Sequence, residues 1–97
     1  MEIVFNNHSS LSVITKAGLS VIFDPWFKSK VFNNSWSLLH EEVPKSNSFH
    51  KDSIVYISHE HPDHFNIPTI KQYFSDNYLL GRNDFRKEIK NTAKKYA

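Results

Sequence analysis

The sequence predicts an α/β (α+β) fold with a mixed β-sheet and helices on one of its faces. Two patterns indicate this fold. The N-terminal part carries strand-like apolar runs around a glycine-containing turn, which is typical of an antiparallel hairpin. The C-terminal part alternates strand-like and helix-like segments in the order β-α-β-α. The chain has 97 residues, so we expect at most one domain with a modest core.

The N-terminal part contains three expected strands. The first is "EIVFNN" at residues 2–7, and "SLSVIT" and "LSVIFDP" follow at residues 10–15 and 19–25. The intervening "KAG" supplies a glycine for the turn of a hairpin. Pro25 ends the last of these strands, because proline has no N–H to donate to the sheet.

Residues 25–52 form the irregular part of the chain, rich in Ser, Asn and Pro. A loop of this length is commonly functional or disordered. Its aromatic side chains argue against disorder, so we expect the loop to pack over another part of the protein. Three of them either wall a substrate pocket or belong to a local core, namely Trp26, Phe32 and Trp36.

The clearest strand is "SIVYISH". Its central side chains are apolar on both faces, which predicts a strand that is covered on both sides. A helix is expected next over "NIPTIKQYFSDN", residues 66–77, with a proline in its first turn. Ile67, Ile70 and Phe74 form the apolar stripe of this helix.

A further short strand, "YLLG", is expected at residues 78–81. The last segment, residues 83–97, predicts a helix whose apolar face holds Phe85, Ile89, Ala93 and Tyr96. It also carries the basic run "RKEIKNTAKKY" in a chain of net charge +2. Such a run either attracts nucleic acid or a membrane surface or forms a solvated helix face. We favour the solvated face and expect neither nucleic acid nor membrane as a partner.

Cysteine is absent from the sequence. Disulfides, thiolate metal sites, iron–sulfur clusters and cysteine nucleophiles are therefore excluded within this chain. The N-terminal "MEIVFNNHSS" does not resemble a signal peptide, and no apolar run approaches the ~20 residues of a membrane span. We therefore expect a soluble, cytoplasmic protein.

The stretch "SHEHPDHFN" gathers metal-binding side chains directly after the clearest strand. His59 and His61 can converge, because residues i and i+2 of an extended backbone point to the same side. Pro62 then turns the chain and brings Asp63 and His64 round. Imidazole and carboxylate groups suit Zn²⁺, Fe²⁺ or Mn²⁺, and ligand sites in α/β sheets lie beyond the carboxyl ends of strands. The stretch therefore predicts a metal site.

The stretch has three other interpretations. It is not the H-E-x-x-H motif of helical zinc proteases, because position 63 is Asp and Pro62 disfavours a helix. A two-histidine, one-carboxylate iron site of His59, His61 and Asp63 leaves His64 unused. A polar surface loop is the plainest interpretation. Four ligand-type residues within six positions favour a metal site over that loop.

The motif "HEHPDH" fits the H-x-H-x-D-H pattern of the metallo-β-lactamase superfamily. The upstream "NHSSLSVITKAGLSVIFDPWF" resembles the opening hairpin of that superfamily, ending in its Asp-bearing strand. The similarity is greatest to a branch that includes L-ascorbate-6-phosphate lactonase-like proteins and the metal-binding part of CMP-N-acetylneuraminate hydroxylase. The segment "DPWF…VFNNSWSLLHE" resembles the latter in particular.

The resemblance implies a four-layer αββα sandwich with two metal ions, usually zinc, with iron or manganese as alternatives. It implies that His59 and His61 bind the first metal, that Asp63 and His64 bind the second, and that a hydroxide between the metals is the nucleophile. Asp63 would also transfer a proton, as the catalytic residue. Asp24 would orient a ligand histidine through a hydrogen bond, although a turn residue before proline is an equal alternative.

His8 either lines the site or has a structural role, and we favour the structural role over a ligand role, because a lone histidine beside a strand is more often structural. In the family's fold, further metal ligands come from later segments, yet no histidine follows His64. We therefore expect residues 1–97 to be the N-terminal half of the domain, incomplete as a catalyst on its own.

The expected function is a metal-dependent hydrolase acting on a phosphate ester, phosphodiester or lactone, with a small-molecule substrate once the site is completed. The alternatives are a non-catalytic metal-binding or interaction fragment, and part of an iron-dependent hydroxylase-like protein. Expected partners are a second copy of the chain, through self-association, or the missing C-terminal half.

Overall fold

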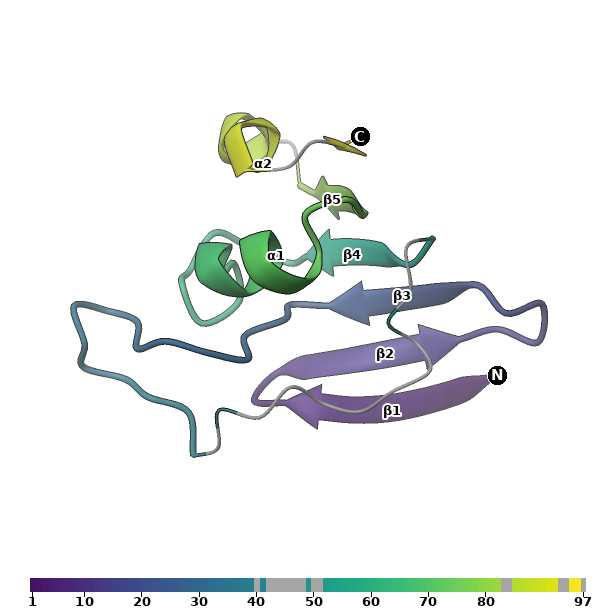
Figure 1. The fold of residues 1–97 in the computed structure, drawn as a ribbon, viewed down its shortest axis with the longest axis horizontal. Helices are drawn as coiled ribbons and strands as arrows, with labels where there is room; N and C mark the ends of the chain where they lie inside the picture. The colour runs from purple at the N-terminus through teal and green to yellow at the C-terminus, as the bar shows by residue number, and fades with distance from the viewer. Residues whose placement is uncertain (40, 42–48, 50–51, 83–84, 93–94, 97) are drawn as a thin grey trace.

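The computed structural model describes residues 1–39, 41, 49, 52–82, 85–92 and 95–96. They form one mixed sheet with the strand order β1-β2-β3-β4-β5-β6 (Figure 1). The elements are β1 (Glu2–Asn7), β2 (Ser10–Ile14), β3 (Ser20–Phe23), β4 (Ile54–Ile57), α1 (Ile67–Tyr73), β5 (Tyr78–Gly81), α2 (Arg86–Thr92) and β6 (Lys95–Tyr96). Strands β1, β2 and β3 pair antiparallel, and β3 to β6 pair parallel. The expected strands at the hairpin, at 53–59 and at 78–81 are thus present.

The hydrophobic core lies between one face of the sheet and the two helices. Ile22, Val55 and Leu79 lie opposite one another on β3, β4 and β5, so their side chains share a face, and each is at most 1% exposed. Ile57 of β4 also belongs to this cluster, and the helices and loops contribute the rest, namely Phe27, Phe65, Ile70, Phe74, Phe85 and Ile89. Both helices thus pack on one face of the mixed sheet, as predicted.

The irregular segment after β3 packs against that core, as its aromatic residues predict. Phe27 is 1% exposed and stacks on Phe49 with ring centroids 5.6 Å apart. Further along, Val31 and Trp36 pair in a short antiparallel bridge. Trp36 is 51% exposed, so this part of the loop projects from the body of the protein.

The predicted helix over residues 66–77 is shorter than expected. Asn66 caps its first turn, because its side-chain oxygen accepts a hydrogen bond from the Thr69 N–H at 3.0 Å. The helix ends after Tyr73, where Ser, Asp and Asn favour a turn. Ile70 and Phe74 are buried as predicted, but Ile67 is 40% exposed and does not belong to the apolar stripe.

The prediction of one helix over residues 83–97 is wrong at its C-terminal end. Helix α2 ends at Thr92, and Lys95–Tyr96 forms β6 beside β5. The backbone groups at the edge of β5 find hydrogen-bond partners in β6. A longer helix would leave these groups without partners. Ala93 lies outside the described residues. Both described helices have seven residues, and neither is long and apolar enough to cross a membrane.

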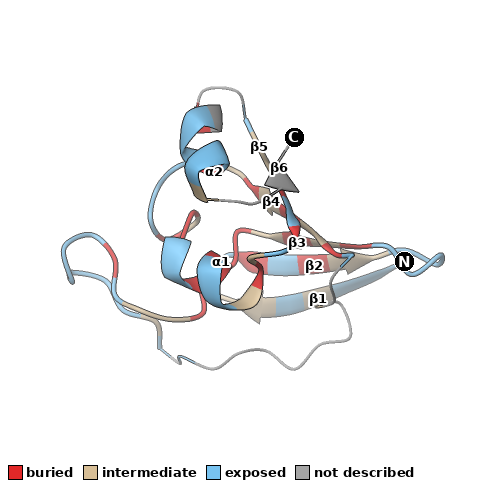
Figure 2. Cartoon of the chain, turned by 45° about the horizontal axis from the view of Figure 1, so that its top comes forward, coloured by how far each residue is buried: buried red, intermediate tan, exposed pale blue. Residues whose placement is uncertain are grey.

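The opposite face of the sheet is apolar and open to solvent in the described part of the chain. Figure 2 shows how much of the β1–β2 hairpin is exposed. Ile3, Phe5 and Leu11 are 63%, 65% and 42% exposed. By register, Val13, Val21, Phe23, Ile54, Tyr56, Tyr78 and Leu80 share this side, which we call the open face. The predicted cover on both sides of β4 is therefore wrong for these residues, since Ile54 and Tyr56 are only half-buried.

Candidate metal centre

The predicted metal-binding stretch lies between the carboxyl end of β4 and the start of α1. The backbone N–H groups of His64 and Phe65 both donate to the carbonyl of His61, at 2.9 and 2.8 Å. This tight turn reverses the chain and gathers the three histidine rings. The ring centroids of His59 and His61 are 4.8 Å apart, and those of His59 and His64 are 4.0 Å apart. The structure therefore brings the histidines of the motif together.

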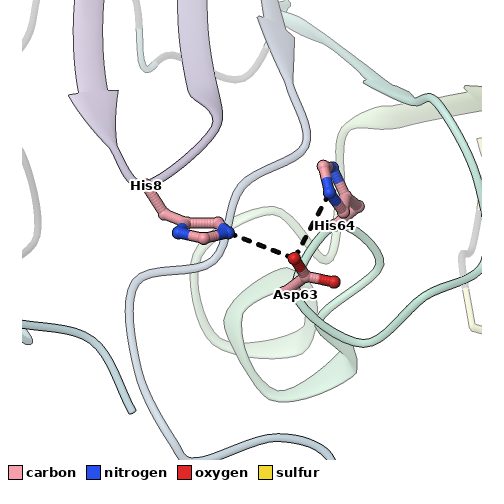
Figure 3. Close-up of side chains that lie close together, drawn as sticks. All are labelled: His8, Asp63 and His64. Atoms are coloured by element: carbon pink, nitrogen blue, oxygen red, sulfur yellow. Dashed lines mark hydrogen bonds and ion pairs between the residues drawn. The ribbon is translucent and has the colours of Figure 1, made fainter. Parts of the chain in front are cut away.

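Asp63 is the centre of a closer grouping of potential ligand atoms (Figure 3). Its Oδ2 atom lies 3.1 Å from His8 Nε2 and 3.3 Å from His64 Nε2. The three side chains offer ligand atoms that all lie within 4.8 Å of one another. Asp63 is 7% exposed, whereas His8 is on the surface, at the turn between β1 and β2.

The spacing of these atoms suits a metal ion. In a tetrahedral zinc site with bonds of about 2.0–2.1 Å, neighbouring ligand atoms are separated by roughly 3.3 Å. The two separations from Asp63 Oδ2, 3.1 and 3.3 Å, are close to that value, whereas the group as a whole spans up to 4.8 Å, so the two histidine rings must move closer together to bind one ion. Imidazole nitrogen and carboxylate oxygen also form a donor set that zinc, iron and manganese accept. The residues present therefore fit the ion that the motif predicts.

Asp24 lies behind the histidines and accepts three hydrogen bonds. Its Oδ1 accepts from the Ser58 N–H at 2.7 Å, and its Oδ2 accepts from Ser58 Oγ at 2.6 Å. Its Oδ2 also lies 2.9 Å from His64 Nδ1. A carboxylate only accepts, so His64 carries a proton on Nδ1, and its Nε2 is the nitrogen that faces Asp63. Asp24 therefore makes the hydrogen bond to a histidine that its predicted orienting role requires. That His64 is a metal ligand stays a prediction.

Two residues of the centre have an unusual backbone. His8 and Asp24 have φ angles of 51° and 46°, in the left-handed region that residues other than glycine seldom adopt. Such conformations persist where the surrounding structure enforces them, and they cluster at functional sites. A bulge between Phe5 and Asn7 precedes His8, and bulges commonly redirect a side chain.

The sequence did not predict the contact between His8 and Asp63. We expected a structural role, yet the structure sets its ring against Asp63, 55 positions away. The ring of Trp26 packs edge-on against it, with centroids 4.8 Å apart. The signal in the sequence was the weak "NHSS" resemblance alone, because contact between distant segments leaves no local spacing pattern.

Two aromatic residues of the loop, Trp26 and Phe32, have different surroundings. Trp26 is 1% exposed and donates from Nε1 to the Ser29 carbonyl at 2.9 Å, so it is part of the local core beside His8. The Phe32 ring lies 6.3 Å from that of His61. A cavity of about 810 Å³ adjoins this edge of the centre, and its walls include Phe32, Glu60 and Pro62. It is large enough for a small-molecule substrate.

A mixed sheet with helices on one face, and a His/Asp cluster beyond a parallel strand, define an α/β domain with a candidate metal site. Residues 2–94 match the family described as "Beta-lactamase superfamily domain", and the chain belongs to that family. The expected superfamily is thereby confirmed.

Curated relatives resemble a shorter part of the chain. Over 55 residues, which are 54% of this chain, the sequence is 44% identical to cytidine monophosphate-N-acetylneuraminic acid hydroxylase of Cricetulus griseus. It is 42% identical to that of Sus scrofa and 40% identical to the inactive human protein. The matched segment spans only 9%, 12% and 11% of these proteins. No solved structure matches the chain.

Proposed function

We propose that the chain supplies the divalent-metal site of a metallo-β-lactamase-type hydrolase that acts on a phosphate ester, phosphodiester or lactone. The observation that carries the proposal is the approach of His8 and His64 Nε2 to Asp63 Oδ2, at 3.1 and 3.3 Å. Two imidazole nitrogens and a carboxylate are the usual donors of such sites. Zinc is the proposed ion: His8, Asp63 and His64 would hold one ion, and His59 and His61 of the motif would hold the other.

The bound metal would supply a hydroxide near neutral pH, because it lowers the pKa of bound water to about 7. The protein groups have separate tasks around it. Asp24 holds the His64 ring through Nδ1, which keeps Nε2 aimed at Asp63. Asp63, beside its role as a ligand, would accept a proton during the reaction. Trp26 packs against His8 and shields it from water on that side.

A second candidate is an iron-dependent hydroxylase-like role. The observation that favours it is the 44% identity to a hydroxylase over 55 residues. Imidazole and carboxylate ligands suit Fe²⁺ as well as Zn²⁺, so the residues alone do not choose between them. Because Zn²⁺ binds such donors more tightly than Fe²⁺, the metal that copurifies with the chain, measured without added metal and without oxygen, separates the two proposals: iron favours the hydroxylase-like role and zinc the hydrolase. A non-catalytic metal-binding fragment would bind either ion without turnover.

We expect the 97-residue chain alone to show no substantial hydrolase activity after zinc loading. Catalytic zinc sites hold about three protein ligands per metal in fixed geometry. In the proposed arrangement His8 adds a third ligand to the ion at Asp63 and His64, but only His59 and His61 serve the other ion. Misplacement of a reacting group by ~1 Å costs on the order of a hundredfold in rate. The assay uses generic phosphodiester, phosphomonoester and lactone substrates. Zinc-dependent turnover by a confirmed monomer, lost in Asp63→Ala, would contradict this expectation.

We also propose that the open face binds a second apolar sheet, as in an αββα sandwich, and that copies of the isolated chain associate through it. Ile3 and Phe5 are each more than 60% exposed on this face, and exposed apolar patches favour association. Phe5→Lys should move the chain from oligomer to monomer in size-exclusion chromatography with light scattering. Asn91→Lys adds the same charge on exposed α2 and should leave the oligomer unchanged. A wild-type monomer at micromolar concentration, with cooperative unfolding, argues against this proposal.

A further inference from the structure

Ser58 lies between Asp24 and the first histidine of the motif. It is the residue that directly follows β4, and it is half-buried. Its Oγ atom lies 2.6 Å from Asp24 Oδ2 and 2.8 Å from His59 Nδ1. Ser58 therefore connects the Asp24 carboxylate to a second histidine, beyond the His64 ring that Asp24 contacts directly.

The hydroxyl proton of Ser58 can serve only one of these two contacts. The Asp24 carboxylate has no proton to donate, so its hydrogen bond with Ser58 exists only if Ser58 donates. The distance of 2.6 Å falls within the range of about 2.5–2.7 Å that is typical of O–H···O⁻ bonds. Ser58 Oγ is then left to accept at His59, and the donor of that bond is an N–H at Nδ1.

The opposite arrangement is disfavoured. If Ser58 donated to His59 Nδ1, its oxygen lone pairs would face the Asp24 carboxylate at the same short distance, with no proton between them. Hydrogen bonds to a charged acceptor are the stronger ones, so the proton stays on the side of Asp24. The backbone N–H of Ser58 also donates to Asp24, at 2.7 Å, and this bond fixes the side chain's position.

We propose that Ser58 is a positioning residue that holds His59 in the form protonated at Nδ1, which leaves the Nε2 lone pair free to bind metal. The inference rests on the proposed metal site, and it extends that site to a residue outside the histidine motif. Asp24 then sets the protonated nitrogen of two rings, that of His64 directly and that of His59 through Ser58. Outer groups of this kind commonly alter metal affinity by about 10–100-fold.

The test records ring-nitrogen NMR spectra of the metal-free chain labelled with ¹⁵N at histidine. Wild-type His59 should show a protonated Nδ1 and an unprotonated Nε2. Ser58→Ala should shift His59 toward the form protonated at Nε2, and Ser58→Thr, which keeps the hydroxyl, should restore the wild-type spectrum. Ser75→Ala removes the hydroxyl of another half-buried serine and should change nothing at His59.

Zinc titration of the same proteins provides the second measurement. Ser58→Ala should weaken zinc binding by about 10–100-fold, and Ser58→Thr should not. A wild-type His59 protonated at Nε2, or a His59 spectrum unaffected by Ser58→Ala, overturns the inference. The wild-type spectrum decides the matter alone if Ser58→Ala does not fold. If the rings respond as expected but wild type binds no zinc, the inference on Ser58 holds and the proposed metal function fails.

Discussion

Replacing Asp63 with alanine should weaken zinc binding by at least about a hundredfold. Loss of a residue that only supports a ligand costs about 10–100-fold in metal affinity, and loss of a ligand itself should cost more. Asp63 Oδ2 is the atom that lies within 3.3 Å of both His8 Nε2 and His64 Nε2. Its removal deletes the carboxylate donor and also leaves the two imidazoles without the group between them. The dissociation constant is measured by isothermal titration of the metal-free chain with Zn²⁺.

Two further variants make this result specific. Asp63→Asn keeps the size of the side chain and removes its charge, so it should also weaken zinc binding, by less than Asp63→Ala. Asp52→Ala removes an exposed carboxylate elsewhere and should leave zinc binding unchanged. If Asp63→Ala binds zinc as tightly as Asp52→Ala, Asp63 is not a ligand and the proposed centre is wrong.

Asp24→Asn should weaken zinc binding by about 10–100-fold although the two side chains have nearly the same shape. The amide keeps one acceptor oxygen for the Ser58 N–H, but its NH₂ group then faces Ser58 Oγ and His64 Nδ1. A donor opposite His64 Nδ1 favours the ring form protonated at Nε2. This form lacks the Nε2 lone pair that a metal ion needs. The mismatch should also lower the free energy of unfolding by about 1–3 kcal/mol.

Urea denaturation and zinc titration of Asp24→Asn measure these two effects. Asp52→Asn makes the same change at an exposed position and serves as the control. The account requires both quantities to change in Asp24→Asn and neither in Asp52→Asn. Full zinc affinity in Asp24→Asn would show that the hydrogen bond to His64 does not govern metal binding.

Local patterns predicted the parts of the fold that local chemistry determines. The strand at Ile54–Ile57 and the cluster after it were recognisable because the ligand spacing and the apolar run both lie within a few consecutive residues. Asn66 and the proline after it correctly marked the start of α1. Apolar periodicity also predicted the burial of Phe85 and Ile89.

Features that depend on contacts between distant segments were not predicted. The pairing of β6 with β5 competes with a helical pattern that the sequence carries through Tyr96, and only the position of the neighbouring strand decides it. His8 reaches Asp63 because a bulge and a left-handed backbone redirect it, and no residue spacing encodes that path. The link from Asp24 through Ser58 to His59 likewise depends on the parallel placement of β3 beside β4.

The central claim is that these histidines and Asp63 form a metal site, and ring-nitrogen NMR during zinc addition tests it most directly. The account predicts that one or two equivalents of Zn²⁺ shift the ring nitrogens of His8, His59, His61 and His64. Spectra in which these four rings show no shift at stoichiometric zinc would contradict it.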